Sequence, residues 1–203
     1  MIDEGYIKYR IQWLECPALP ADRIEDLISW RDRLHQLGLI GYDEEQQVGY
    51  GNISERVWFG GELFIISGTQ TGEISETQPA HYSSILSYSI PGNCLTCRGP
   101  VKASSESLTH AAVYEYSLDY RAVIHIHHRG MWEALKDEIP TTLETVPYGT
   151  PEMAWEIQRL LTTPDMQSAR VCVMGGHQDG LLAVGKDLDE AGNALLALAG
   201  KFL

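Results

Sequence analysis

The chain has 203 residues, 44% of them apolar, which is enough to bury a sizeable core and argues against extensive disorder. Its 28 acidic and 15 basic residues give a formal net charge of −13, which makes nucleic acid an unsuitable partner but still allows a local pocket for a small anion. Because no apolar run is long enough to span a membrane and residues 1–5 do not read as a signal peptide, we expect a soluble cytoplasmic protein that forms one domain over residues 1–203.

The first elements expected are an edge strand and an amphipathic helix. Residues 6–14 mix polar with β-branched and aromatic side chains ahead of two prolines, which is typical of a strand at the edge of a sheet. Residues 21–37 carry apolar side chains at near-helical spacing, and Gly38 stands where such a helix would stop. We expect this helix to pack one face on the core.

Residues 48–98 are expected to be rich in strands. Short apolar runs separated by Gly and Pro turns predict strands at 57–59, 63–66 and 85–88. Cys94 and Cys97 have the C-x-x-C spacing, but no second pair follows and their segment has the character of a strand. We therefore interpret the cysteines as ordinary reduced thiols.

The second half of the chain is expected to alternate helices and strands. Capping residues begin three helices, at Ser104 or Ser105, at Thr150-Pro151 and at Asp187, and these helices run to residues 116, 161 and 203. Apolar runs predict strands at 122–128, 171–174 and 181–184.

Two histidines share one face of the strand predicted at 122–128. His125 and His127 are two residues apart, so their side chains point the same way, whereas His128 should point away. Two imidazoles on a rigid strand can reach a common zinc ion at roughly 2.0–2.1 Å each. Histidines that only form hydrogen bonds in a core would give the same pattern, so the pair needs a further ligand to indicate a metal.

His177 and Glu106 are the candidate partners of this pair. His177 lies on a glycine-flanked turn between two apolar strands, and three histidines with an open position describe a catalytic metal site. Glu106 is expected in the first turn of the helix before the histidine strand, where its carboxylate could approach the ion. A glutamate stabilised only by the helix dipole would occupy the same position.

Two turns rich in small and hydroxyl residues are expected at strand ends. Their sequences are Gly51-Asn52-Ile53-Ser54 and Ser67-Gly68-Thr69-Gln70-Thr71-Gly72. Turns of this kind can hold phosphate or carboxylate, although the same residues dominate turns that bind nothing.

In chain order, the motifs Gly51-Asn52, Thr71-Gly72, Ser104-Ser105-Glu106, His125-x-His127 and His177 resemble the class II aldolase and adducin superfamily, particularly its fuculose-phosphate aldolase branch. The resemblance extends from Gly51 onward and is most specific between Ser104 and His127. It implies a three-layer α/β/α fold in which helices flank a central, largely antiparallel sheet. It also implies a zinc site at a subunit edge and usually a homotetramer.

The resemblance also assigns roles to the candidate residues. By analogy, His125, His127 and His177 hold Zn²⁺ or another divalent metal, and Glu106 is the acid/base. The residues that would hold a phosphate or similar anion of a small-molecule substrate are Gly51, Asn52, Thr71, Gly72, Ser104 and Ser105.

The chemistry implied is that of a metal-dependent aldolase, a carbon–carbon lyase. A divalent ion that chelates a ketone and its neighbouring hydroxyl stabilises the enediolate left when the carbon–carbon bond breaks. Epimerases, dehydratases and decarboxylases use similar sites, and adducin-like scaffolds keep the fold without the metal. Retention of three histidines and Glu106 favours an enzyme.

The chain departs from the aldolase pattern in three segments. Residues 139–148 are shorter than the loop that brings a proton-donating tyrosine in the aldolases, and we expect the closing C-terminal tail to be absent after Leu203. Gln178 and Asp179 also stand between His177 and the next glycine, which follows the histidine directly in many relatives. The prediction of a metal site is therefore independent of the prediction of aldol cleavage.

Overall fold

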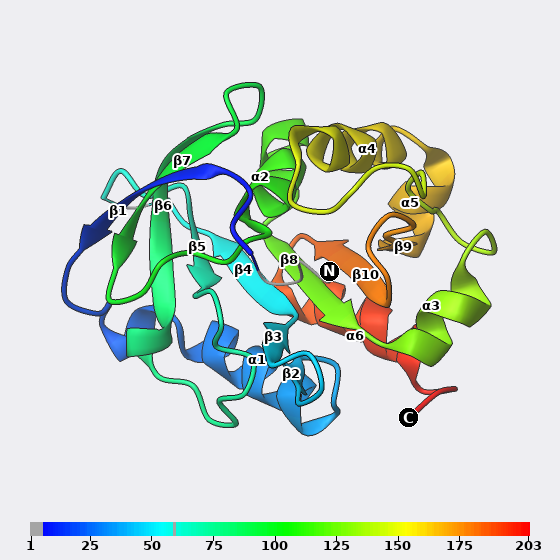
Figure 1. Cartoon of the computed structure of the whole chain (residues 1–203), viewed down its shortest axis with the longest axis horizontal. Helices are drawn as coiled ribbons and strands as arrows, with labels where there is room; N and C mark the ends of the chain where they lie inside the picture. Colours follow the sequence, from blue (N-terminus) through cyan, green and yellow to red (C-terminus); the bar gives the residue numbers. More distant parts are fainter. Residues whose placement is uncertain (1–5, 59) are drawn as a thin grey trace.

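The computed structural model describes residues 6–58 and 60–203, and their central element is an eight-stranded sheet of order β1-β7-β6-β5-β4-β8-β10-β9 (Figure 1). Neighbouring strands are antiparallel apart from β1 and β7, which are parallel. The strands are β1 (Arg10–Glu15), β4 (Asn52–Arg56), β5 (Phe64–Ser67), β6 (Tyr82–Ser89), β7 (Cys94–Gly99), β8 (Ala122–His127), β9 (Val171–Val173) and β10 (Gly180–Gly185). The predicted largely antiparallel sheet is confirmed.

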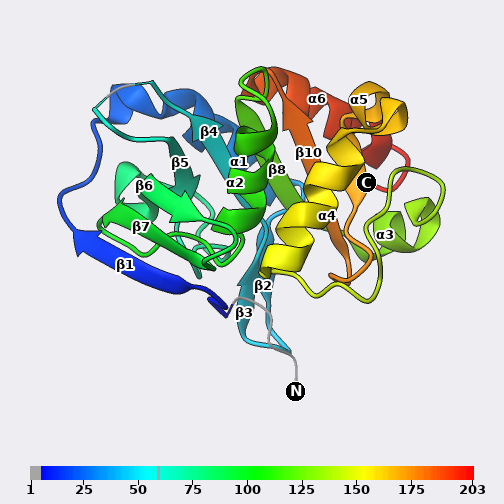
Figure 2. The ribbon, with the colours of Figure 1, turned by 90° about the horizontal axis from the view of Figure 1, so that it is seen from above.

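Helices cover both faces of the sheet, as Figure 2 shows from above. One face is packed by α2 (Ser107–Tyr116), α4 (Pro151–Leu161) and α5 (Pro164–Ala169). The other is packed by α1 (Glu25–Gln36), α3 (Arg129–Leu135) and α6 (Leu188–Ala199). Each layer encloses its own apolar core, so the predicted three-layer α/β arrangement is confirmed.

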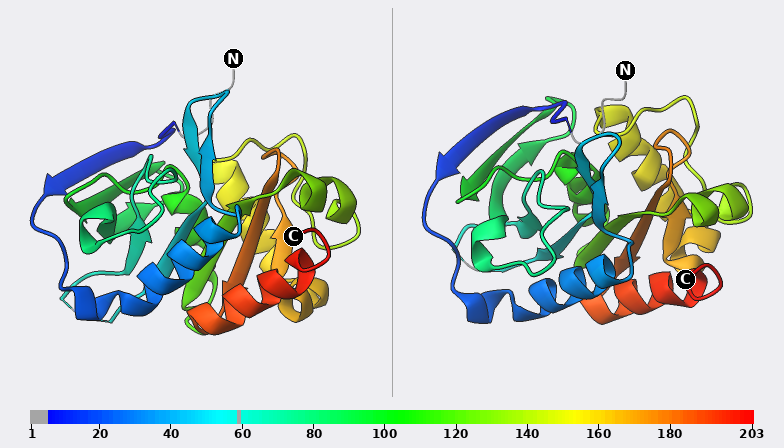
Figure 3. Two further views of the ribbon diagram at one scale, coloured as in Figure 1. Left: turned by 90° about the horizontal axis from the view of Figure 1, so that it is seen from below. Right: turned by 60° about the horizontal axis from the view of Figure 1, so that its bottom comes forward.

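Two 3-10 turns and one β-hairpin lie outside these layers. The 3-10 turns η1 (Ala21–Arg23) and η2 (Pro79–His81) precede α1 and β6. The strands β2 (Gly41–Asp43) and β3 (Val48–Tyr50) form a separate hairpin, which projects from the body of the molecule in the left view of Figure 3. No helix within residues 6–58 and 60–203 combines the length and apolarity needed to cross a bilayer.

The first predicted elements are confirmed in their main part. Residues 21–37 form η1 followed by α1, and Gly38 ends the helix in the left-handed conformation at φ +71°. The strand predicted at 6–14 starts only at Arg10. The reason is that Tyr9 turns inward, where its buried hydroxyl donates a hydrogen bond to the Ser104 carbonyl at 2.7 Å.

The strand predicted at 57–59 is wrong for Val57 and Trp58, and Phe59 lies outside the described residues. The strand in this region is β4, which comprises the more polar Asn52–Arg56, whereas the strands predicted at 63–66 and 85–88 correspond to β5 and β6. The first three residues of β4 are buried although two of them are polar, because neighbouring polar groups can form hydrogen bonds with their side chains. The Ser54 hydroxyl, for example, is 2.7 Å from His110 Nδ1.

In the second half, the three predicted strands agree with β8, β9 and β10 to within one residue at each end. The helix predicted to begin at Ser104 or Ser105 begins at Ser107 instead, and its N-cap residue Glu106 makes no side-chain capping bond. The last helix ends at Ala199 rather than at residue 203, because the chain turns back there and Phe202 donates its N–H to the Ala199 carbonyl.

The capping residues predicted for the other two helices are confirmed. The Thr150 hydroxyl accepts the Met153 N–H at the start of α4, and the Asp187 carboxylate accepts the Glu190 N–H at the start of α6. Helices α3 and α5 were not predicted, because each is too short to show a clear apolar period.

We predict that Gly192→Ala destabilises the fold. Alanine normally favours a helix over glycine by about 1 kcal/mol, but a Cβ at position 192 of α6 would overlap the buried Trp30 ring of α1. The Trp30 indole is also fixed by a 2.9 Å hydrogen bond to Asp189. Overpacking should therefore dominate and lower the free energy of unfolding by about 1–3 kcal/mol in urea titrations.

The matched control is Gly200→Ala at the end of the same helix, where the nearest atom to a new Cβ is the Leu196 carbonyl oxygen at 3.5 Å. This variant should stay within about 0.5 kcal/mol of the parent. Equal stability of the two variants would contradict the packing argument.

Candidate functional site

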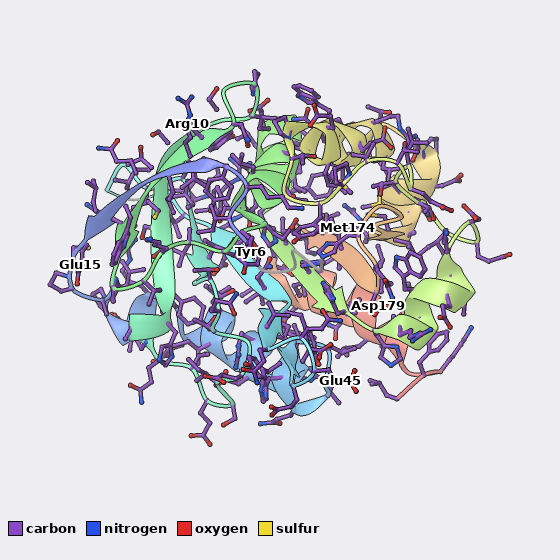
Figure 4. All side chains as sticks on the ribbon, viewed as in Figure 1. Tyr6, Arg10, Glu15, Glu45, Met174 and Asp179 are labelled. Carbon is purple, nitrogen blue, oxygen red and sulfur yellow. The ribbon has the colours of Figure 1, made fainter. Side chains whose placement is uncertain are left out.

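Three histidines converge where β8 meets the turn between β9 and β10. His125 and His127 lie two residues apart on β8, and His177 lies on that turn, which the labels Met174 and Asp179 bracket in Figure 4. One ligand atom from each residue lies within 4.8 Å of those of the other two, and the Nε2 atoms of His125 and His127 are 3.1 Å apart. The predicted convergence is confirmed.

The donor set fits a divalent metal. Tetrahedral zinc with nitrogen ligands at roughly 2.0–2.1 Å requires those nitrogens to be roughly 3.3 Å apart, close to the His125–His127 separation. His125 Nδ1 lies 3.0 Å from the Leu181 carbonyl oxygen. Because a carbonyl oxygen can only accept a hydrogen bond, Nδ1 carries the proton of the imidazole. The lone pair of Nε2 then faces the other histidines.

The electrostatics of His125 agree with this assignment. Burial, together with the neighbouring His177 and His127, holds the pKa of His125 well below its usual 6.5. The ring is therefore neutral near pH 7, which is the form in which a histidine binds metal.

Glycine at position 180 makes room for the cluster. A Cβ there would lie 3.1 Å from His125 Cε1 and 3.2 Å from His177 Cγ, so a larger residue would press on both rings. The turn closes through a 3.0 Å hydrogen bond from the Gly180 N–H to the His177 carbonyl, and Asp179 takes a left-handed conformation at φ +65°. The two extra residues after His177 are accommodated in this way.

His128, considered as a substitute ligand, is not part of the cluster. Its Nδ1 accepts the Met131 N–H at 3.1 Å and caps α3. Its ring lies 6.1 Å from that of Phe202, which packs on the face of the sheet opposite to Val123, as alternation predicts.

One cavity brings together the predicted anion-binding residues. Its walls include all six of these residues together with Glu106 and His125, and the six are Gly51, Asn52, Thr71, Gly72, Ser104 and Ser105. Asn52 pairs with His125 across β4 and β8, which places the two side by side. The Asn52 Oδ1 atom is buried and has no hydrogen-bond partner among the described residues. This amide oxygen is a polar group that a ligand could satisfy.

The predicted turn around Gly51 is corrected in part, because Asn52, Ile53 and Ser54 belong to β4. Gly51 alone makes the turn, at φ +76°, and a Cβ there would lie 2.8 Å from Ile40 Cγ1. Gly72 is required for packing, since its Cβ would overlap the Gly41 carbonyl oxygen of the hairpin. The backbone packing therefore requires glycine at both positions, whether or not these residues contact a ligand.

Glu106 is held at the entrance to α2. It is 2% exposed, and its Oε2 accepts a 2.8 Å hydrogen bond from the Thr109 hydroxyl one turn along the helix. The Glu106 N–H donates to Ser104 Oγ at 3.3 Å. These contacts fix the carboxylate at the wall of the cavity that His125 also borders.

Three residues near the site were not predicted from the sequence. Thr109 holds Glu106, the Tyr148 ring stacks on His177, and Arg31 of α1 donates hydrogen bonds to the Thr71 and Gly72 carbonyls. The signal for Arg31 was a charged residue on the apolar face of the predicted helix. The other two residues lack such a signal, because their contacts depend on how distant segments pack.

Comparisons with known proteins identify the family and the fold of the chain. The family model of the Class II Aldolase and Adducin N-terminal domain matches residues 37–200. Among solved structures, the chain is similar to L-fuculose-1-phosphate aldolase from Thermus thermophilus, with 22% identity, a TM-score of 0.64 and coverage of 89% of this chain and 91% of that one.

A second similar structure is YgbL from Escherichia coli, a putative aldolase/epimerase/decarboxylase, with 17% identity, a TM-score of 0.63 and coverage of 88% and 86%. A third is a sugar-phosphate aldolase from Thermotoga maritima, with 18% identity, a TM-score of 0.63 and coverage of 88% and 91%. Such identities show a shared fold. A search of curated proteins gives no match.

We predict that purified protein holds about one Zn²⁺ or similar divalent ion per chain and that His125→Ala or His177→Ala removes it, since a catalytic site needs three protein ligands. Metal analysis after dialysis measures this. The matched control is His128→Ala, which should keep the ion because His128 caps α3. Equal metal loss in all three variants, or no metal in the parent, would contradict the prediction.

We predict that His110, which is fully buried on α2, makes the stability of the fold sensitive to acid. Burial lowers its pKa from 6.5 to about 3, so between these values the unfolded chain binds a proton that the folded chain does not. The free energy of unfolding is therefore unaffected by protonation of His110 above pH 6.5. Below that pH, protonation of the unfolded chain lowers it by up to about 1.4 kcal/mol per pH unit.

His110→Asn should make the urea-unfolding free energy less dependent on pH between about 6 and 4. Leu108→Met, which changes a buried residue of the same helix without removing a titratable group, is the control and should keep the parental slope. An unchanged slope in His110→Asn would refute the assignment.

Proposed function

Because the chain belongs to the class II aldolase and adducin family, we propose that it is a metal-dependent carbon–carbon lyase of the aldolase type, acting on a small hydroxylated carbonyl compound that carries phosphate or a similar anion. The observation that supports the proposal most directly is the shared cavity. It is bordered by His125 of the histidine cluster, by Glu106, and by the Ser, Thr, Asn and Gly residues predicted to bind an anion.

The residues divide into three roles in this proposal. His125, His127 and His177 would hold a divalent ion, most simply Zn²⁺, and the ion when bound supplies a Lewis acid for charge that develops on substrate oxygens. Asn52 would contribute its side-chain amide to an anionic or hydroxyl group, close to the hydroxyls of Ser104 and Ser105. Thr71 would contribute mainly through its backbone, since its own hydroxyl donates to the Gly68 carbonyl at 2.9 Å.

Glu106 would act as the acid/base. Thr109 occupies its Oε2, so the carboxylate cannot rotate freely and presents a fixed face to the cavity. From this position it can accept a proton from a substrate oxygen or carbon and return it to the other product fragment, without a Schiff-base lysine. Burial excludes water from the carboxylate and keeps the proton within the site.

Several features of the proposal stay predictions. The homotetramer, the cytoplasmic location and the extent of the single domain come from the sequence and from the family. The name of the similar YgbL protein includes epimerase and decarboxylase, so those reactions are the alternatives that the assay must separate. A scaffold of the adducin type would neither need the metal nor turn over a substrate.

We predict that Glu106→Gln lowers kcat by about 10²–10⁴-fold while the metal content is unchanged, because glutamine keeps the volume but cannot take up a proton. The measurement is aldehyde release from a panel of sugar phosphates, trapped chemically, with epimerised and decarboxylated products followed in parallel.

The matched control is Glu115→Gln, which removes the same charge from the exposed far end of the same helix. It should retain parental activity. A metal-loaded parent that converts none of these substrates would refute the lyase proposal, and full activity in Glu106→Gln would refute the role of this residue.

A further inference from the structure

The segment from Thr142 to Gly149 packs directly behind the turn that carries His177. The Thr142 hydroxyl is buried and accepts the Gly175 N–H at 2.9 Å. A Cβ on Gly176 would overlap the Val146 carbonyl oxygen, so the two backbones are as close as glycine allows. This segment, which the sequence predicts to be shorter than the corresponding aldolase loop, therefore supports the histidine turn.

Tyr148 places an aromatic ring of this segment against the histidine cluster. Its ring lies parallel to the His177 imidazole, with centroids 4.2 Å apart and planes 17° apart. The His177 ring also lies near His125, with centroids 4.9 Å apart and planes tilted by 30°. Tyr148 is only 6% exposed and belongs to the apolar core beneath α2 and α4, so its ring has a fixed position.

Lys8 covers the opposite face of Tyr148. Its Nζ lies 3.5 Å from the ring centroid and donates a 3.2 Å hydrogen bond to the Tyr148 carbonyl. A residue that precedes the first strand thus clamps both the ring and the backbone of Tyr148. Lys8, the Tyr148 ring and the His177 imidazole therefore lie in succession, and His177 lies beside the tilted ring of His125.

His177 needs such support more than the other two histidines do. His125 and His127 are placed by a strand that is paired on both sides, whereas His177 is on a turn. A ligand imidazole must present its nitrogen within a narrow range of angles, and contacts outside the ligand set usually fix that orientation. The flat face of Tyr148 restricts rotation of the His177 ring about its side-chain bonds.

We propose that Tyr148 is a positioning residue for His177: its ring, clamped by Lys8, holds the imidazole in the orientation that the shared metal ion requires. The inference rests on the metal centre of the proposed function and does not depend on which reaction follows. It gives the shortened loop a role that differs from proton donation.

The electrostatics of the two rings also favour metal binding by His177. When the histidine shares the charge of a bound cation, its ring becomes electron-poor and is attracted by the electron-rich face of an aromatic neighbour. Tyr148 should therefore stabilise the metal-bound state relative to the metal-free state, and not only the fold.

The test compares Tyr148→Leu with Tyr148→Phe in the full chain, with Zn²⁺ affinity measured by competition with a chromogenic chelator. Loss of a supporting contact around a ligand costs about 10–100-fold in metal affinity, so Tyr148→Leu should bind Zn²⁺ at least about 10-fold more weakly. Tyr148→Phe keeps the stacked ring and should remain within about twofold of the parent.

Two further measurements separate positioning from general destabilisation. The visible spectrum of the Co²⁺-loaded protein should change in Tyr148→Leu but not in Tyr148→Phe, because it reports ligand geometry. The control Tyr88→Leu removes a partly buried tyrosine that packs against the same core from β6, three strands from β8, and should leave affinity and spectrum unchanged.

The outcomes distinguish the inference from the proposed function. If the parent binds no divalent ion, the metal centre itself is refuted. If the parent binds the ion and Tyr148→Leu binds it equally well with the same spectrum, the positioning role is refuted while the metal centre stands. Equal losses in Tyr148→Phe and Tyr148→Leu would also overturn the inference, because the hydroxyl rather than the ring would then be responsible.

Discussion

Side-chain alternation along β8 is the constraint on which the site depends. Val123 is buried in the core beneath α2 and α4, and alternation sends His125 and His127 to that same face further along the strand. α2 begins at Ser107, so the apolar cover stops near its N-terminal end, where Glu106 and His125 meet in one cavity. The candidate metal ligands and the acid/base candidate thus lie together because one strand passes from the core to the edge of the helical layer.

The position of His177 depends on the close approach of neighbouring backbone segments, which side-chain alternation along β8 does not explain. Gly176 lets the segment carrying Tyr148 contact the histidine turn, and Gly180 leaves room between the His125 and His177 rings. Each of these glycines would overlap or crowd a neighbour if it carried a Cβ, so both are fixed by sterics rather than by ligand chemistry. This explains how a turn, which is usually more mobile than a strand, can hold a ligand residue.

The sequence predicted the histidine cluster well because its two anchoring residues follow a local rule, the period of a strand. Its failures were non-local. β4 was not recognised because Ser54 is buried against His110 and Tyr114, so the strand lacks an apolar pattern. The start of α2 was misplaced because Ser104 is used elsewhere: its carbonyl accepts from Tyr9 and Ser107. No local pattern could indicate partners up to 95 residues away.

The negative charge of the chain bears on how an anion could be bound. With a net charge of −13, long-range attraction is not available, so the cavity must depend on nearby dipoles. The buried Arg31 guanidinium donates a hydrogen bond to the Thr71 carbonyl at 2.6 Å. The N–H and C=O of a trans peptide point in opposite directions, so the Gly72 N–H of this peptide points away from Arg31. A Cβ at residue 49 would lie 3.0 Å from that nitrogen, so Gly49 leaves space around it. A cation in the core therefore orients the peptide of a glycine that lines the cavity, and the proposed anion site would depend on such dipoles rather than on an exposed positive charge.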